Sequence, residues 1–221
     1  MKFKIKLIID IFMLILLIMA MSYLLLGQVA HKHIGIALIS LFIVHNLLNM
    51  NWYKHLFRGK YTVIRFVQTF INLATLIFMF LAGFSGLLLA NLLPEIFNQF
   101  SFIARTFHLI GAYWGFILIA MHIGCHWQMV QNLIRKYIKS IYLWGILRFM
   151  VGVSVFYGIY AMVKYDFFAY LFLQNEFFFF DDKQSFISFF IDYMAIMSVW
   201  MWFSYYIYQA TKRNFARLER K

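Results

Sequence analysis

The feature that most constrains the fold is a series of long apolar segments, each longer than the roughly 18 residues that mark a membrane-spanning helix. Six such segments are expected, over residues 5–26, 31–50, 61–90, 105–127, 141–163 and 186–210. Of the 221 residues, 64% are hydrophobic and only 13% are charged. We therefore expect an all-α integral membrane protein with six transmembrane helices in a lipid bilayer.

The distribution of positive charge predicts the orientation of these helices. A formal net charge of +12 would suggest a nucleic-acid partner for a soluble chain, but not for a membrane protein. Only four of the 20 Lys and Arg residues fall on or near one side of the expected membrane: Lys32, Arg105, Lys164 and Lys183. The other 16 lie with the termini and the loops near residues 58 and 137. Because basic loops stay in the cytoplasm, both termini are expected there.

Two of the expected spans carry histidines, which are costly inside lipid unless something binds them. His108 and His122 are 14 residues apart, so an α-helix places them roughly 21 Å apart on nearly one face. His31 and His45 repeat this spacing in the second span. Since the two spans run in the same direction, we expect His31 to pair with His108 at the outer level and His45 with His122 at the inner level.

Matched histidine pairs on two helices are suited to hold haem, because haem iron takes axial imidazoles and the ring needs an apolar slot. The absence of side chains lets a flat ligand approach the backbone at three nearby glycines, Gly35, Gly111 and Gly115. The chain has one cysteine and no C-x-x-C-H motif, so covalent haem attachment is excluded. We therefore expect two b-type haems in a bundle of the first four helices. The expected iron ligands are His31, His45, His108 and His122.

Two further residues are candidates for cofactor binding. His126 lies one turn after His122 and five turns after His108, so it can ligate the inner haem, bond a propionate or serve a quinone. The matched 14-residue spacing favours His122, and a non-haem metal site on the i,i+4 pair His122/His126 stays open. Arg105 can pair with propionates of the outer haem or simply extend to the membrane interface. Any of the histidines could instead be an interface anchor or a hydrogen-bonded core residue.

About residues 1–130 resemble the flavinylation-associated cytochromes, a family of bacterial membrane proteins. The motifs that carry the resemblance are His31-x-x-x-Gly35, His45 with Asn49, residues 56–61, Ser85-Gly86, Ala104-Arg105-x-x-His108, Ala112-Tyr113-Trp114, and His122-x-Gly124-x-His126-Trp127. His33 departs from the pattern, which has an aromatic residue there. The 14-residue pairing is also similar to the dihaem core of respiratory cytochromes b. The resemblance implies electron transfer through b haems in the bacterial inner membrane, with an extracytoplasmic flavoprotein as partner.

The expected organisation is a four-helix cytochrome b-like core over residues 1–140, followed by two helices and an outer aromatic and acidic loop over residues 141–221. The expected function is electron transfer from quinol or a cytoplasmic donor to an external acceptor. One alternative is a reductase that acts directly on an external metal ion such as ferric iron. Another is a histidine-dependent metal transporter, which the scarcity of carboxylates in the spans disfavours. A subunit without cofactor requires the histidine spacing to be chance.

Overall fold

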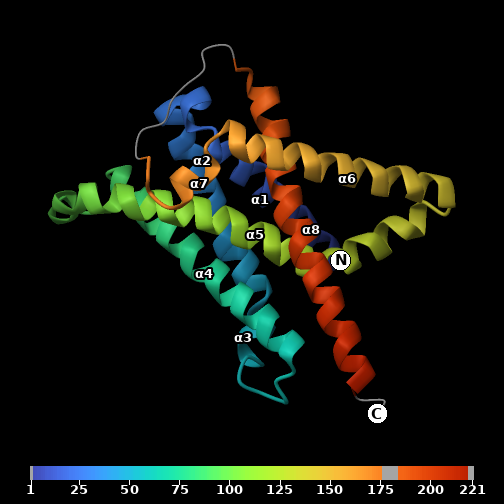
Figure 1. Cartoon of the computed structure of the whole chain (residues 1–221). Helices are drawn as coiled ribbons and strands as arrows, with labels where there is room; N and C mark the ends of the chain where they lie inside the picture. The colour runs from blue at the N-terminus through green and yellow to red at the C-terminus, as the bar shows by residue number, and fades with distance from the viewer. Residues whose placement is uncertain (1, 176–183, 219–221) are drawn as a thin grey trace. The chain divides into compact units, whose positions relative to one another are not determined.

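The structure is a computed structural model of the chain, and it describes residues 2–175 and 184–218. Within these residues all regular structure is helical, which confirms the all-α fold class (Figure 1). The α-helices are α1 (Lys2–Met21), α2 (Tyr23–Leu48), α3 (Met50–Lys54), α4 (Val63–Leu89), α5 (Ser101–Tyr137), α6 (Ile141–Lys164), α7 (Phe167–Leu171) and α8 (Phe186–Leu218). A 3₁₀ helix, η1 (Glu95–Phe100), precedes α5. Residues 176–183 of the expected aromatic and acidic loop lie outside the described residues.

Five of the described helices are long and apolar enough to cross a membrane, namely α2, α4, α5, α6 and α8. The chain is therefore a multi-pass membrane protein. Helix α1 is not among the five, because every 18-residue stretch of it contains Lys4, Lys6 and Asp10. Charged residues raise the cost of inserting a helix into lipid. The expected six spans are thus not confirmed, and a crossing by α1 stays a prediction.

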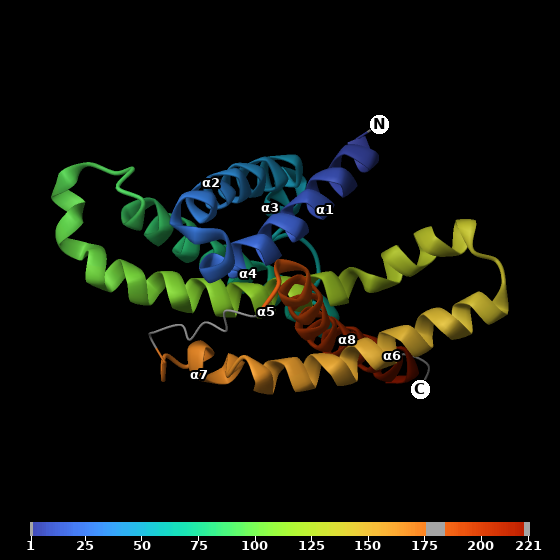
Figure 2. The same ribbon diagram turned by 90° about the horizontal axis from the view of Figure 1, so that it is seen from above.

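The bend between α1 and α2 lies earlier than the turn expected at residues 27–30. Helix α1 ends at Met21, and the Ser22 hydroxyl donates to a carbonyl in its last turn at 2.7 Å. Helix α2 then contains a kink at Gly27, whose φ of 76° and ψ of 169° are almost restricted to glycine. Helices α1 and α2 contact each other along the hairpin that results (Figure 2). His31 therefore follows the kink by about one helical turn.

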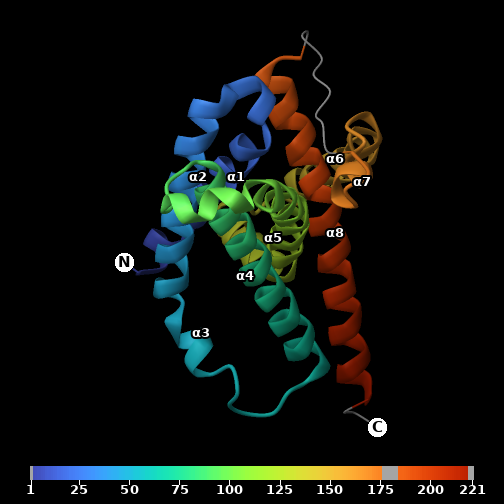
Figure 3. The same ribbon diagram turned by 90° about the vertical axis from the view of Figure 1, so that its left-hand side faces the viewer.

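The other expected spans agree with the helices to within a few residues at their starts. Helix α4 covers residues 63–89 of the predicted span 61–90, and helix α6 covers the whole of the predicted span 141–163. Helix α2 is followed after Asn49 by the short helix α3 (Figure 3). Helices α5 and α8 continue well beyond the predicted ends at residues 127 and 210.

The chain divides into two compact units that interleave along the sequence. The first comprises residues 1–60, 77–113 and 169–190, and the second comprises residues 61–76, 114–168 and 191–221. Helices α4, α5 and α8 each contribute to both units. Neither unit begins or ends near residue 140. The expected division into a core over residues 1–140 and two further helices over residues 141–221 stays a prediction.

Small residues let the helices of the first unit approach closely. A Cβ added at Gly83 of α4 would collide with Ile39 of α2, and one added at Gly111 of α5 would lie 2.6 Å from the Ala82 backbone nitrogen. Ala82 and Gly83 of α4 therefore lie at close contacts with neighbouring helices. Close backbone contact is also the role that the structure gives Gly111.

Aromatic stacking and one buried polar network organise the second unit. Phe116 of α5 is fully buried and packs against Phe167 and Tyr193. Asp192 of α8 is also fully buried, and its carboxylate accepts hydrogen bonds from α6 and from Tyr165, the residue that caps α6. A buried aspartate in a membrane helix therefore has its charge compensated.

Candidate functional site

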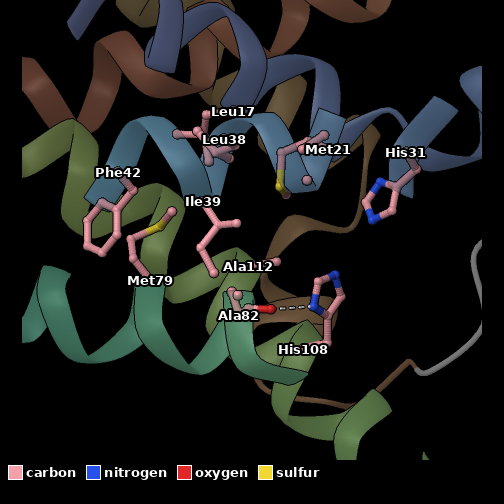
Figure 4. Close-up of a pocket in the computed structure, with 13 residues that line it drawn as sticks. Leu17, Met21, His31, Leu38, Ile39, Phe42, Met79, Ala82, His108 and Ala112 are labelled. Atoms are coloured by element: carbon pink, nitrogen blue, oxygen red, sulfur yellow. Dashed lines mark hydrogen bonds between the residues drawn. The ribbon is translucent and has the colours of Figure 1, made fainter. Parts of the chain in front are cut away.

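His108 lies on α5 in the first unit, and its ring is held by α4. The Nδ1 atom of His108 lies 2.9 Å from the carbonyl oxygen of Ala82 (Figure 4). A carbonyl only accepts hydrogen bonds, so Nδ1 carries the proton and Nε2 keeps its lone pair. Gly86 leaves room for this ring, because a Cβ there would lie 3.2 Å from Cε1 of His108. The local sequence thus fixes both the tautomer and the orientation of the imidazole.

His31 on α2 faces His108 within the same unit. The two ring centroids are 5.9 Å apart and the ring planes are at 82°. Figure 4 shows a nitrogen of each ring directed toward the other ring. A metal ion bound by two opposed imidazole nitrogens at about 2.0–2.1 Å separates the ring centres by roughly 6 Å. The predicted outer pair is therefore brought together at a separation that suits axial ligation.

The Nδ1 atom of His31 is buried and makes no hydrogen bond of normal geometry to the described residues, although the Ala20 backbone interacts with the ring. A buried polar atom without a partner is unusual in a folded protein. Tyr23 packs edge-on against the same ring, with centroids 5.1 Å apart. The position of the His31 ring is thus set by packing, whereas that of His108 is set by a hydrogen bond.

An apolar cavity of about 80 Å³ lies beside this pair of histidines (Figure 4). Its lining comes from α1, α2, α4 and α5 and includes Gly35, where an added Cβ would meet nothing within 4 Å. Cofactor sites usually have volumes of about 300–1,000 Å³. The separation of the two imidazoles suits axial ligation of iron, but the cavity beside them is smaller than a haem ring requires.

His45, the predicted inner ligand on α2, is held by a carboxylate. Its Nδ1 lies 2.7 Å from Oδ1 of Asp10 on α1. The Asn49 amide nitrogen makes a long contact of 3.4 Å with Nε2, and Lys6 donates to the Asn49 side-chain oxygen at 2.8 Å. Metal binding through Nε2 would replace the weak Asn49 contact and leave the Asp10 hydrogen bond intact.

His122, the other predicted inner ligand, lies on α5 in the second unit. Its Nδ1 is 2.8 Å from the side-chain oxygen of Asn72 on α4. The ring of His126 is 4.9 Å from that of His122, centroid to centroid, and His126 is exposed. The expected pairing of His45 with His122 joins residues of different units and stays a prediction, as does the choice between His122 and His126.

The hydrogen bonds of His45, His108 and His122 share one form. In each of the three, Nδ1 is bonded to an oxygen on a different helix. His33 and His55 are exposed instead, and their Nδ1 atoms bond to the carbonyl four residues earlier in the chain. Ligating histidines usually donate their second ring nitrogen to a carboxylate, a carbonyl or a similar acceptor. Three of the four predicted ligands therefore have the outer shell expected of metal ligands.

The remaining predicted site residues are placed as follows. Arg105 is exposed on the first turns of α5, and its pairing with a propionate stays a prediction. Gly115 is buried in the second unit, and Gly111 packs on α4 as described above. The sequence analysis missed Asp10 and Asn72 as partners of histidines. Each is a polar side chain in a largely apolar helix, and this signal could have marked the residue but not the ring that it meets.

No protein-family model, curated protein or solved structure matches this chain. Within residues 2–175 and 184–218, no group of three or more His, Cys, Asp and Glu side chains is arranged to hold a metal ion. A haem iron needs only two protein ligands. The class that the fold defines is a multi-pass helical membrane protein.

Proposed function

We propose that this chain is a b-type cytochrome that transfers electrons across a membrane through two haems with two histidine ligands each. The observation that carries the proposal is the orientation of the imidazoles: three of the four predicted ligands have Nδ1 bonded to an oxygen on another helix. The approach of His31 to His108, with centroids 5.9 Å apart, supports the outer pair. The inner pair, His45 and His122, is inferred from the 14-residue spacing alone.

The residues of the chain would bind and orient the cofactors, while haem iron supplies a one-electron redox couple when bound. His108 and His122 present Nε2 because their Nδ1 protons are committed to acceptors. Ligation by two histidines would leave no open iron position for oxygen, so the chain would favour electron transfer over oxygen activation. The cavity beside His31 has a mostly apolar lining, and a hydrophobic surrounding is one of the means by which a protein tunes a redox potential.

The proposed setting follows from the charge distribution and the family resemblance. Both termini lie in the cytoplasm of a bacterial cell, and the chain spans the inner membrane. Quinol or a cytoplasmic reductant donates electrons near His45 and His122, with His126 as a residue for a quinone. An extracytoplasmic flavoprotein is the proposed acceptor near His31 and His108. This partner rests on analogy to the flavinylation-associated cytochromes.

A set of histidine variants tests the proposal. His108→Ala and His122→Ala should each bind one haem fewer than the unmodified protein, measured as haem per chain. His33→Ala is the matched control, because His33 is exposed and bonds only within its own helix. Equal haem content in His108→Ala and His33→Ala would exclude His108 as a ligand. Uptake of divalent metal by a colourless protein, lost in His31→Ala, would favour the transporter instead.

A further inference from the structure

The cavity beside His31 and His108 is smaller than a haem ring requires, but it has room for a single metal ion. Its volume is about 80 Å³, and both imidazoles line it, with ring centroids 5.9 Å apart. Two opposed nitrogens that each lie about 2.0–2.1 Å from one ion give nearly this separation. All the residues that line the cavity belong to the first unit. The geometry therefore suits one ion between the two rings.

Each of the two imidazoles has a nitrogen available to such an ion. His108 donates its Nδ1 proton to the Ala82 carbonyl, so its Nε2 keeps a lone pair. The Nδ1 atom of His31 is buried and has no hydrogen-bond partner of normal geometry among the described residues. Figure 4 shows a nitrogen of each ring directed toward the other ring. Two neutral nitrogen ligands therefore converge on the space between the rings.

The same cavity contains a thioether near the imidazoles. Met21, the last residue of α1, lines the cavity, and Figure 4 shows its sulfur on the same side of Ile39 as the two histidine rings. Met79 lies at the opposite end, beside Phe42. A methionine side chain has three rotatable bonds, so its sulfur can adjust to an ion. Thioether ligands favour soft ions such as copper(I).

The charge of the surroundings favours an ion of low charge. No Asp or Glu side chain is among the described residues that line the cavity. The cost of moving an ion out of water rises with the square of its charge, so a charge of +1 costs about a quarter as much as +2 for ions of one size. Zinc(II) and copper(II) would be buried here without a compensating anion. Copper(I) meets both conditions, because it is soft and carries a single charge.

We propose that His31, His108 and Met21 form a binding site for copper(I) in the chain that holds no haem. The two imidazoles and the thioether supply three neutral ligands to the ion. This inference goes beyond the proposed function and does not rest on it. Copper(I) and an axially bound haem need the same two histidines, so each excludes the other at this site.

The experiment is a titration of the full chain, purified without haem from cells that cannot make it, with copper(I) under anaerobic and reducing conditions. A coloured copper(I) chelator competes with the protein and reports its affinity. We expect one copper(I) per chain, and zinc(II) should not displace it. X-ray absorption of the loaded protein should show two nitrogen neighbours and one sulfur neighbour of copper. No binding of copper(I), or nitrogen neighbours without sulfur, would overturn the proposal.

Matched variants locate the site. His31→Ala and His108→Ala should lose copper(I), whereas His33→Ala should retain it, because His33 is exposed and bonds within its own helix. Met21→Leu keeps an apolar side chain and removes the sulfur, so the affinity should fall at least about tenfold, a loss typical of even an outer-shell partner. Met19→Leu is its control, since Met19 lies on the same helix and does not line the cavity. Equal affinities in Met21→Leu and Met19→Leu would contradict the assignment of the sulfur ligand.

Failure of this proposal and failure of the proposed function are distinguishable. Haem per chain in protein from cells with ample haem tests the cytochrome, and copper(I) binding by the haem-free chain tests the copper site. If protein with bound haem takes up copper(I) at His31 and His108 without losing haem, these residues do not ligate haem and the copper site stands. Haem-free protein that binds no copper(I) overturns the copper site, whatever the haem content of the protein from other cells.

Discussion

At the scale of single residues, the acceptors beside His45, His108 and His122 decide which ring nitrogen is left to bind a metal. Asn72 does this for His122, with its side-chain oxygen 2.8 Å from Nδ1. Removing such a partner typically costs 10- to 100-fold in metal affinity, because the ring loses its orientation and the tautomer is no longer fixed. Asn72 is therefore as informative to substitute as the histidine itself.

We predict that Asn72→Ala weakens the binding of one haem by about 10- to 100-fold and leaves the other unaffected. Haem titration of the haem-free protein measures both affinities. Asn132→Ala is the control, because Asn132 is exposed and bonds to Gln128 on its own helix. Two unchanged affinities in Asn72→Ala would show that the His122 ring needs no outer support, against our account of the site.

A second residue-scale prediction concerns the space beside His108. In Gly86→Ala the new Cβ would lie 3.2 Å from Cε1 of His108, so the ring must shift by a few tenths of an ångström. We expect this variant to weaken or remove the haem bound by His108 and to leave the other in place, measured as haem per chain. Gly145→Ala should bind both haems normally, because nothing lies within 4 Å of a Cβ at that position. Normal binding in both variants would contradict a ligand role for His108.

The spacing of the histidines could be predicted from the sequence, but the hydrogen-bond partners of their rings could not. The positions of His31 and His108 on their helices follow from a period of 3.6 residues, so their place at one level could be predicted. The acceptors could not, because Asp10 and Asn72 reach the rings from other helices. Which polar group of one helix meets a given ring depends on how the helices pack, and a local pattern carries no such information.

At the scale of helices, Gly27 controls how α2 approaches α1. Its φ of 76° and ψ of 169° lie in a region that costs other residues on the order of 1–3 kcal/mol. We expect Gly27→Ala to destabilise the protein by about that amount and to reduce binding of the haem at His31, which follows the kink. Thermal unfolding and haem content measure the two effects.

The control for this variant is Gly152→Ala. Gly152 lies inside α6 with open space around it, so alanine should be neutral or should stabilise the helix by about 0.5–1 kcal/mol. Equal unfolding temperatures for Gly27→Ala and Gly152→Ala would mean that the kink at Gly27 is not required. The sequence predicted a turn at residues 27–30, and the structure has a kink at Gly27 after an earlier break at Ser22. Apolar residues on both sides of Ser22 hide that break from a hydropathy reading.

The Asp192 network is the second helix-scale feature, and it joins α6 to α8 within the second unit. Tyr157 donates to Oδ1 of Asp192, while Lys164 and Tyr165 donate to Oδ2, each at 2.7 Å. Burial and the Asp192 carboxylate raise the pKa of Tyr165, so that its hydroxyl stays protonated and donates. Beside the network, a Cβ added at Gly158 would collide with the Ala195 backbone, so the two helices are in close contact.

We expect Asp192→Asn to lower the free energy of unfolding by about 1.5–3 kcal/mol, the range for hydrogen bonds to a charged group. Asparagine removes the charge and replaces one acceptor by a donor, so one donor of the network loses its partner. Denaturant unfolding in detergent is the measurement. Asp166→Asn, which changes an exposed aspartate, should have little effect. If the two variants unfold alike, the network does not stabilise the contact between α6 and α8.

At the scale of the whole molecule, the number of crossings depends on α1. Five described helices qualify as spans, and an odd number would place the termini on opposite sides. The positive-inside distribution instead predicts that both termini lie in the cytoplasm, which requires α1 to cross as a sixth span. Lys4, Lys6 and Asp10 lie in the first half of α1, and their charges are the reason that α1 does not qualify as a span by composition.

We predict that reporters fused to the N-terminus and to the C-terminus both give cytoplasmic signals in bacterial cells. Fusions after residue 30 and after residue 98, in the expected outer loops, should give the opposite signal and serve as internal controls. Termini on opposite sides of the membrane would show that α1 does not cross. The outward direction of electron flow inferred above would then need to be re-examined, because the side on which each histidine lies would change.

The most direct test of the account is a reduced-minus-oxidised absorption spectrum of the purified protein, with a pyridine haemochrome assay for haem per chain. The account predicts the spectrum of low-spin b haem and two haems per chain. One haem per chain would mean that one pair is misassigned, and His126 would then be the first residue to test. Protein purified without haem from cells supplied with ample haem would contradict the cytochrome assignment.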